Sequence, residues 1–234
     1  MPVLVPRSAP RFDVAPYRLS GSVYATLLNH RRSLDALRES VAAPPYRGAP
    51  KAVVLAVKPR TALVVPGDPL LVDDDAGELE LGAALGVVIG STACAVAEAD
   101  ALSHVAGYLV VIDGTVPHAS HFRPQIRAMA RDRSCALGTA VVARAEVGDP
   151  DALAMRTFVD GALVATTSTA DHVRSTARLI AEVSDFMTLA PGDVLLTGSA
   201  PDAPRVRAGA RVAVEIDRVG RLETRVAVDE RSER

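Results

Sequence analysis

The segment 77–90, with the sequence GELELGAALGVVIG, constrains the fold of this 234-residue chain more than any other. Its second half, 83–89, is an uninterrupted apolar run of strand length that ends at a glycine, which predicts a buried strand. In its first half, Glu78 and Glu80 are two residues apart, so a strand would place both carboxylates on one face. Together with Asp113, which follows another apolar run, these carboxylates suit an all-oxygen site for Mg²⁺ or Ca²⁺.

Composition excludes several classes of protein. The net charge of −2 and the aromatic content of 3% exclude a generally basic nucleic-acid binder with base-stacking platforms. No apolar run approaches the roughly 20 residues of a membrane span, and prolines interrupt the start of the chain, where a signal peptide needs an apolar core. The two cysteines, Cys94 and Cys135, lack the spacing of a metal site or a disulfide framework. We therefore expect a cytoplasmic protein.

The hydrophobic pattern predicts one domain of many short strands and few helices. Residues 1–20 are rich in proline and are expected to form an extended arm, followed by a single domain over residues 21–230. Helices are expected at 33–41, 97–105 and 171–184, and strands at 23–28, 53–57, 63–65, 70–72, 83–89, 107–112, 139–143, 154–159, 162–166, 194–197, 212–216 and 221–228. The last helix has the strongest signal, with an apolar face of Val173, Ala177 and Ile180. Because strands and helices do not alternate regularly, we predict an α+β fold, a β-rich mixed roll or sandwich.

Several short motifs occur in an order that points to a known family. They are 58–60 (KPR), 86–90 (GVVIG), 107–113 (GYLVVID), 122–124 (FRP), 131–132 (RD), 157–161 (TFVDG) and 189–198 (LAPGDVLLTG). Together they resemble the fumarylacetoacetate hydrolase family over about residues 21–228. Within that family, 28–31 (LNHR) and 45–46 (PY) are similar to the amino-terminal half of isomerase/decarboxylases of 4-hydroxyphenylacetate degradation, rather than to their metal-bearing half.

The resemblance implies a fold, a reaction and a partner. The implied substrate is 5-carboxymethyl-2-oxo-hex-3-ene-1,7-dioate, which is decarboxylated to a 2-hydroxyhepta-2,4-dienedioate that then isomerises. In the family, a divalent cation held by Glu-x-Glu and an aspartate chelates the 2-oxo acid and stabilises the carbanion or enolate. A lysine holds the substrate carboxylate, and a His/Glu pair on a lid transfers protons. Family members pair, so we expect a homodimer or a heterodimer with a metal-bearing sister subunit, through an interface of at least about 2,000 Å².

Matched residue by residue, the chain departs from the family's site. Asp113 matches the third metal ligand and is the expected catalytic residue, whereas Gly82 and Ala84 occupy the positions of the two metal glutamates. We therefore expect no tightly bound divalent ion. Glu80 lies two residues before the first ligand position, about 7 Å along a strand. Three further groups also differ: Ser33 and Ala36 replace the lid pair, Met129 replaces the lysine, and Pro117 replaces an arginine.

The candidate substrate-binding residues are Lys58, Arg123, Arg131, Thr197 and Gly198. Guanidinium groups pair bidentately with carboxylates, and hydroxyl and backbone donors near 197–198 also suit a carboxylate.

Each candidate has a structural alternative. In that alternative, Lys58 and the arginines are solvated surface groups. Glu78 and Glu80 are then solvated carboxylates at a strand edge, and Asp113 is a buried hydrogen-bond acceptor. His118 and His121 are three residues apart and suit proton transfer or metal ligation; the alternative is that they are surface histidines. Two functions remain open at this point: an isomerase/decarboxylase, or a catalytically depleted structural subunit that completes a dimer with a metal-bearing sister.

Overall fold

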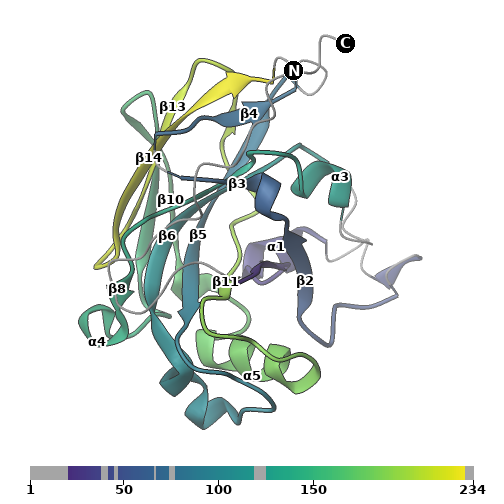
Figure 1. The fold of residues 1–234 in the computed structure, drawn as a ribbon. Helices are drawn as coiled ribbons and strands as arrows, with labels where there is room; N and C mark the ends of the chain where they lie inside the picture. Colours follow the sequence, from purple (N-terminus) through teal and green to yellow (C-terminus); the bar gives the residue numbers. More distant parts are fainter. Residues whose placement is uncertain are drawn as a thin grey trace.

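The computed structural model describes residues 21–37, 42–44, 47–65, 67–73, 77–118 and 125–229. The expected arm, 1–20, lies outside the described residues, as does Arg123. The described chain forms two β-sheets with short helices around them, which confirms the predicted β-rich α+β fold (Figure 1). None of the helices described is long and apolar enough to cross a membrane.

The first sheet contains nine strands among the described residues. Its order is β2-β1-β11-β5-β6-β7-β3, with β12 paired to β5 and β8 paired to β6. The strands are β1 (Val23–Leu27), β2 (Val54–Lys58), β3 (Leu63–Val64), β5 (Leu79–Ile89), β6 (Val105–Thr115), β7 (Cys135–Leu137), β8 (Val142–Ala143), β11 (Val194–Leu196) and β12 (Arg205–Val206).

The second sheet contains five strands, in the order β10-β9-β13-β14-β4. They are β4 (Leu70–Val72), β9 (Ala154–Val159), β10 (Ala162–Ser168), β13 (Arg211–Ile216) and β14 (Gly220–Val228). The helical segments are α1 (Arg31–Ala36), α3 (Ile126–Met129), α4 (Arg144–Val147) and α5 (Thr176–Phe186), with the 3₁₀ turns η1 (Arg60–Ala62), η2 (Glu98–His104) and η3 (Thr169–Asp171). The strands expected at 154–159 and 162–166 are confirmed as the antiparallel pair β9–β10, and those expected at 212–216 and 221–228 as the antiparallel pair β13–β14.

The long strands β5 and β6 separate two cores. Odd-numbered residues of β5, such as Leu81 and Leu85, join the core formed with the second sheet and α5. Even-numbered residues, such as Ala84 and Val88, join a smaller core on the opposite face, with residues of β1 and β11. Strand side chains alternate between faces, so a polar residue at an even position of β5 faces the smaller core.

Helix α5 begins later than the sequence predicts. Ser175 is its N-cap, because its hydroxyl accepts a hydrogen bond from the Arg178 N–H at 3.1 Å. The expected apolar face is wrong at Val173, which precedes the helix and is 37% exposed. Its N–H donates to the carbonyl of Asn29, so it is already used outside the helix. The buried face of α5 consists of Thr176, Leu179, Ile180, Val183 and Ser184.

Three other expected elements differ in type or extent. The helix expected at 97–105 is the 3₁₀ segment η2, and the strand expected at 139–143 is replaced by the separate short strands β7 and β8. The helix expected at 33–41 is α1, which ends at Ala36, and residues 38–41 lie outside the described part of the chain.

Buried Asp193 fixes the start of β11 against the start of β1. Its two carboxylate oxygens accept hydrogen bonds from the Ser22 N–H at 2.6 Å and the Ala190 N–H at 2.8 Å.

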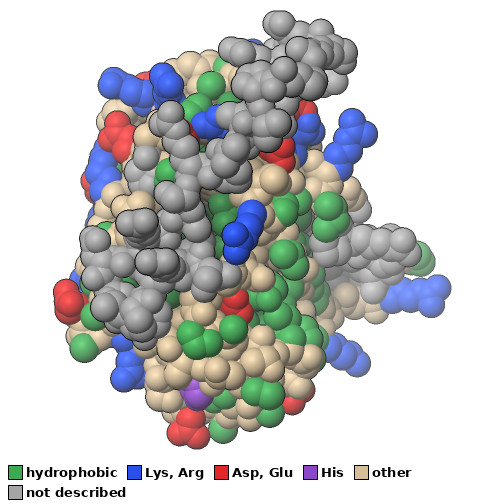
Figure 2. Space-filling view, viewed as in Figure 1, with side chains coloured by type: hydrophobic (Ala, Val, Ile, Leu, Met, Phe, Trp, Pro, Cys, Tyr) green, Lys and Arg blue, Asp and Glu red, His purple; other side chains and the backbone are tan. Residues whose placement is uncertain are grey.

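Charged side chains of both signs are interspersed around the edges of the view in Figure 2. This distribution agrees with the near-neutral net charge and with the exclusion of a generally basic nucleic-acid binder.

Candidate functional site

A pocket of about 320 Å³ opens on the smaller-core face of the first sheet. This volume lies at the lower end of the range of about 300–1,000 Å³ typical of small-molecule sites. Strands β1, β5, β6 and β11, helix α1 and the loop 198–205 supply its walls. The described residues that line it are Ala25, Thr26, Leu27, Leu28, Ser33, Ala36, Leu37, Glu80, Gly82, Ala84, Asp113, Thr115, His118, Gln125, Met129, Leu196, Gly198, Ser199, Ala200, Pro201, Ala203 and Arg205.

The pairing of β5 with β6 brings the sequence-predicted residues together. Gly82 lies opposite Asp113 and Glu80 lies opposite Thr115 in this antiparallel pair. Positions 80, 82 and 84 therefore share the pocket face, as the period of a strand requires. The space in front of Gly82 is filled by Ser199, since a Cβ atom on Gly82 would lie 2.6 Å from the Ser199 Cβ.

Asp113 forms a buried ion pair with Lys58. The Lys58 Nζ lies 2.5 Å from the Asp113 Oδ1 and donates a second hydrogen bond to the carbonyl of Met129 at 2.6 Å. Lys58 is 2% exposed, which excludes the alternative of a solvated surface lysine, and its expected role in substrate binding stays a prediction. Its ammonium supports Asp113 from inside the protein, while the Asp113 carboxylate borders the pocket.

Arg205, a residue that sequence reasoning missed, forms ion pairs with both glutamates of the segment 77–90. Its guanidinium lies 2.8 Å from Glu80 Oε1 and 3.4 Å from Glu78 Oε1. Strand β12 pairs Arg205 directly opposite Glu80. A two-residue strand beside Pro204 gives no periodic signal, and nothing local to the sequence places residue 205 against residue 80.

The donor set does not fit the divalent cation that the family implies. Of the carboxylates lining the pocket, Asp113 is paired with Lys58 and Glu80 is paired with Arg205. Gly82 and Ala84 offer only backbone carbonyls beside Asp113. Within the described part of the chain, no three His, Cys, Asp or Glu side chains are grouped closely enough to hold a metal ion. Both carboxylates of the pocket are therefore engaged by cations of the chain, and positions 82 and 84 add no carboxylate ligand for Mg²⁺.

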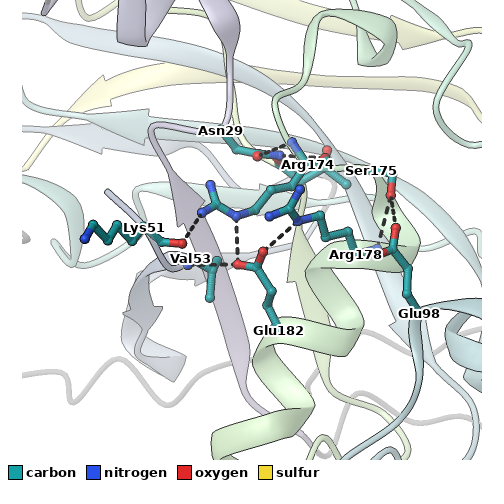
Figure 3. Close-up of polar contacts among 9 residues, drawn as sticks. Asn29, Lys51, Val53, Glu98, Arg174, Ser175, Arg178 and Glu182 are labelled. Carbon is teal, nitrogen blue, oxygen red and sulfur yellow. Dashed lines mark hydrogen bonds and ion pairs between the residues drawn. The ribbon is translucent and has the colours of Figure 1, made fainter. Parts of the chain in front are cut away.

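Asn29, at the end of β1, joins three segments behind the pocket. Its side-chain amide donates to the carbonyls of Arg174 and Thr197 and accepts from the Arg174 N–H. Arg174 in turn donates to Glu182 at 2.7 Å and to the carbonyl of Lys51 at 3.3 Å (Figure 3). Asn29 is 1% exposed, so these bonds fix the pocket wall against the start of α5.

Two buried histidines lie beside this wall. The rings of His30 and His172 pack edge to face with centroids 6.3 Å apart, and the residues are 0% and 5% exposed. The His30 Nδ1 caps α1 by accepting from the Arg32 N–H at 3.3 Å. Both ring nitrogens of His172 lack a hydrogen-bond partner among the described residues. Burial, followed by the neighbouring His30, lowers the pKa of His172 to about 4.

The other predicted site residues are more scattered. Gly198 borders the pocket with a φ of 104°, a backbone conformation that favours glycine. Thr197 is fully buried next to it, and its hydroxyl has no partner among the described residues. Arg131 is held by an ion pair with Asp73 and does not line the pocket. Arg123 and His121 lie outside the described residues, so their proposed roles remain predictions.

The comparisons with known proteins agree with this architecture. The model of the fumarylacetoacetate (FAA) hydrolase C-terminal domain matches residues 22–227. The chain belongs to the fumarylacetoacetate hydrolase family. Its sequence is 36% identical over 214 residues to the 4-hydroxyphenylacetate degradation bifunctional isomerase/decarboxylase of Escherichia coli. That match covers 91% of this chain but 48% of the relative, so the chain spans about half the length of that relative.

Two solved structures share the fold of this chain. The 5-carboxymethyl-2-hydroxymuconate delta-isomerase from Mycobacterium smegmatis has a TM-score of 0.74 and 28% identity, over 90% of this chain and 80% of that one. Fumarylpyruvate hydrolase from Pseudomonas aeruginosa, in complex with Mn²⁺ and pyruvate, has a TM-score of 0.77 and 25% identity, over 97% and 100%. Relatives of this chain are therefore enzymes, and one of these two structures is a complex with Mn²⁺.

Proposed function

We propose that this protein acts in the decarboxylation and isomerisation of 5-carboxymethyl-2-oxo-hex-3-ene-1,7-dioate during cytoplasmic 4-hydroxyphenylacetate catabolism. The observation that carries the proposal is the pocket at Asp113, in a chain that matches isomerase/decarboxylases of this catabolism over 91% of its length. The pocket lies on the face where the family's sequence pattern expects the substrate.

The pocket offers groups for an anionic substrate. The Arg205 side chain is 56% exposed, so its guanidinium is reachable while Glu78 and Glu80 fix its orientation. Gly198 and Ser199 also line the pocket and add backbone and hydroxyl groups. In this arrangement Arg205 and the 198–199 segment bind substrate carboxylates, and Lys58 acts by positioning Asp113.

The proposal includes acid–base chemistry without a tightly bound divalent ion at Asp113. The two pocket carboxylates are each neutralised by a cation of the chain, and positions 82 and 84 supply no further carboxylate. A divalent cation at Asp113 would have to displace Lys58 from an ion pair that is already formed, and breaking such a pair is costly because Lys58 is buried.

A second candidate function is a structural subunit that pairs with a metal-bearing sister. The specific observation that favours it is the replacement of the lid residues by Ser33 and Ala36, which line the pocket but cannot transfer protons. The relative from E. coli is about twice as long as this chain, which accords with one chain supplying half of a pair. For such a pair we propose an interface over exposed apolar residues, among them Val57, Leu163 and Val164.

Turnover by the purified chain tests the first proposal against the second. The chain is supplied with the dioate, and release of CO₂ and the product's NMR spectrum are followed. Ser199→Phe fills the pocket without removing a charge and should abolish turnover. Asp217→Asn removes only a surface ion pair with Arg156 on the second sheet and should leave turnover unchanged.

The outcomes separate the two candidates. Turnover by the chain alone that Ser199→Phe abolishes supports the enzyme. Turnover that appears only when a metal-bearing family subunit is added, and that Ser199→Phe does not change, identifies the structural subunit. Turnover of the Ser199→Phe variant alone at the wild-type rate contradicts a reaction in this pocket.

A further inference from the structure

Arg205 brings a positive charge to the wall of the pocket. It lies on β12, directly opposite Glu80 of β5, and both residues line the pocket. Among the described residues that line the pocket, Arg205 is the single arginine or lysine. An anionic group that enters the pocket therefore meets a positively charged lining side chain at Arg205.

The Arg205 guanidinium keeps donors for a ligand. Its Nε and Nη2 donate to Glu80 Oε1 at 3.1 and 2.8 Å, and its Nη1 donates to Glu78 Oε1 at 3.4 Å. These hydrogen bonds use three of the five N–H groups of an arginine, so one N–H is left on each terminal nitrogen. Arg205 has no other partner within the described part of the chain. Two N–H groups on neighbouring nitrogens match the two oxygens of a carboxylate.

The position of Arg205 along β5 suits a substrate with two carboxylates. Ser199 lines the pocket beside Gly82, since a Cβ atom on Gly82 would lie 2.6 Å from the Ser199 Cβ. Glu80, which holds the Arg205 guanidinium, lies two residues from Gly82, about 7 Å along the strand. An extended chain of seven carbons separates its terminal carbons by about 7–8 Å. A seven-carbon dioate with its 2-oxo end at Ser199 therefore reaches Arg205 with its far carboxylate.

We propose that Arg205 makes this pocket specific for dioates, by binding the carboxylate farthest from the 2-oxo group. The inference rests on the proposed function and adds the residue that selects its substrate. Glu80 is a positioning residue, because it accepts from both Nε and Nη2 and so sets the plane of the guanidinium. The far carboxylate is held by an ion pair and hydrogen bonds alone, and no covalent bond forms or breaks at Arg205.

Three ligands and two variants test this selection. 2-Oxoheptanedioate and 2-oxoheptanoate have the same length and differ only in the far carboxylate, whereas the terminal carbons of 2-oxopentanedioate are only about 5 Å apart. Arg205→Gln removes the positive charge and keeps a polar side chain. Arg156→Gln is the matched control, because Arg156 lies on β9 of the second sheet, pairs with Asp217 and does not line the pocket.

Calorimetry measures the dissociation constant of each ligand. We expect the wild type to bind 2-oxoheptanedioate about 10-fold more tightly than 2-oxoheptanoate, the effect of one charge-assisted contact to a carboxylate. Arg205→Gln should bind both seven-carbon ligands as the wild type binds 2-oxoheptanoate, and Arg156→Gln should behave as the wild type. 2-Oxopentanedioate should bind equally well to the wild type and to Arg205→Gln, because its far carboxylate does not reach residue 205.

Each other outcome overturns the inference. If Arg205→Gln still prefers 2-oxoheptanedioate, the far carboxylate is bound elsewhere. If Arg205→Gln weakens the binding of all three ligands alike, Arg205 supports the shape of the pocket and does not select the ligand. If the wild type binds both seven-carbon ligands equally well, the pocket makes no such selection, and the proposed function keeps its 2-oxo acid site. A wild-type chain that binds none of the ligands contradicts the proposed function itself, and this inference with it.

Discussion

The buried histidine pair predicts an acid-sensitive fold. His172 has an ordinary pKa of 6.5 in the unfolded chain and a pKa lowered to about 4 in the folded one, and the pKa of His30 is lowered by burial as well. Between these two pKa values the unfolded state binds the proton more readily than the folded state. The free energy of unfolding therefore falls as the pH falls from about 6.5 towards 4, and above pH 6.5 none of it is lost through His172.

The size of the effect follows from the pKa difference. The His172 contribution amounts to about 2 kcal/mol at pH 5 and about 3 kcal/mol at pH 4. Replacing the ring by Phe removes the titrating group and with it this loss. His172→Phe should therefore lose about 2 kcal/mol less than the wild type between pH 8 and pH 5.

Urea denaturation at pH 8, 6 and 5 measures this difference. Each variant is referred to its own free energy of unfolding at pH 8, so any packing change made by Phe cancels. His104→Phe is the control, since His104 lies outside the histidine pair, and it should follow the wild-type profile. Parallel pH profiles for the wild type and His172→Phe would refute the reasoning.

Three further predictions concern the pocket and its support. Lys58→Met leaves the Asp113 carboxylate without its buried partner and should lower the free energy of unfolding by about 3–5 kcal/mol, measured in urea, and adding Asp113→Asn to it should recover much of this loss. Asn29→Ala removes three buried hydrogen bonds behind the pocket and should cost about 2–4 kcal/mol, whereas an unchanged urea midpoint would show that the wall does not depend on this amide. Combining Gly82→Glu and Ala84→Glu with Ser199→Gly, which clears the space in front of residue 82, should create Mn²⁺ binding detectable by calorimetry, and the two glutamates without Ser199→Gly should bind it more weakly.

The sequence predicts the strand faces of the pocket well, because a strand has a fixed period of two. The apolar runs ending near Gly90 and Asp113 are the long central strands, and positions 82, 84 and 113 share the pocket face, as expected. The family was also identified correctly, since its motifs are spread over most of the chain.

Contacts between distant residues were beyond sequence reasoning. The Lys58–Asp113 and Glu80–Arg205 pairs join positions 55 and 125 residues apart, and no local pattern encodes which carboxylate meets which cation. The start of α5 was misplaced for the same reason, because Asn29, which is 145 residues away, takes the Arg174 N–H. The 3₁₀ form of η2 was missed because its apolar spacing also suits a short α-helix.

The central claim is that this pocket works on a 2-oxo dioate without a divalent cation at Asp113. The most direct test is the isomerisation rate of the wild-type chain, freed of metal by a chelator and then supplied with Mg²⁺ or Mn²⁺. We predict that the metal-free chain converts 2-hydroxyhepta-2,4-dienedioate in the presence of the chelator, at a rate that neither ion raises. Conversion that is lost in the chelator and restored by either ion would contradict it.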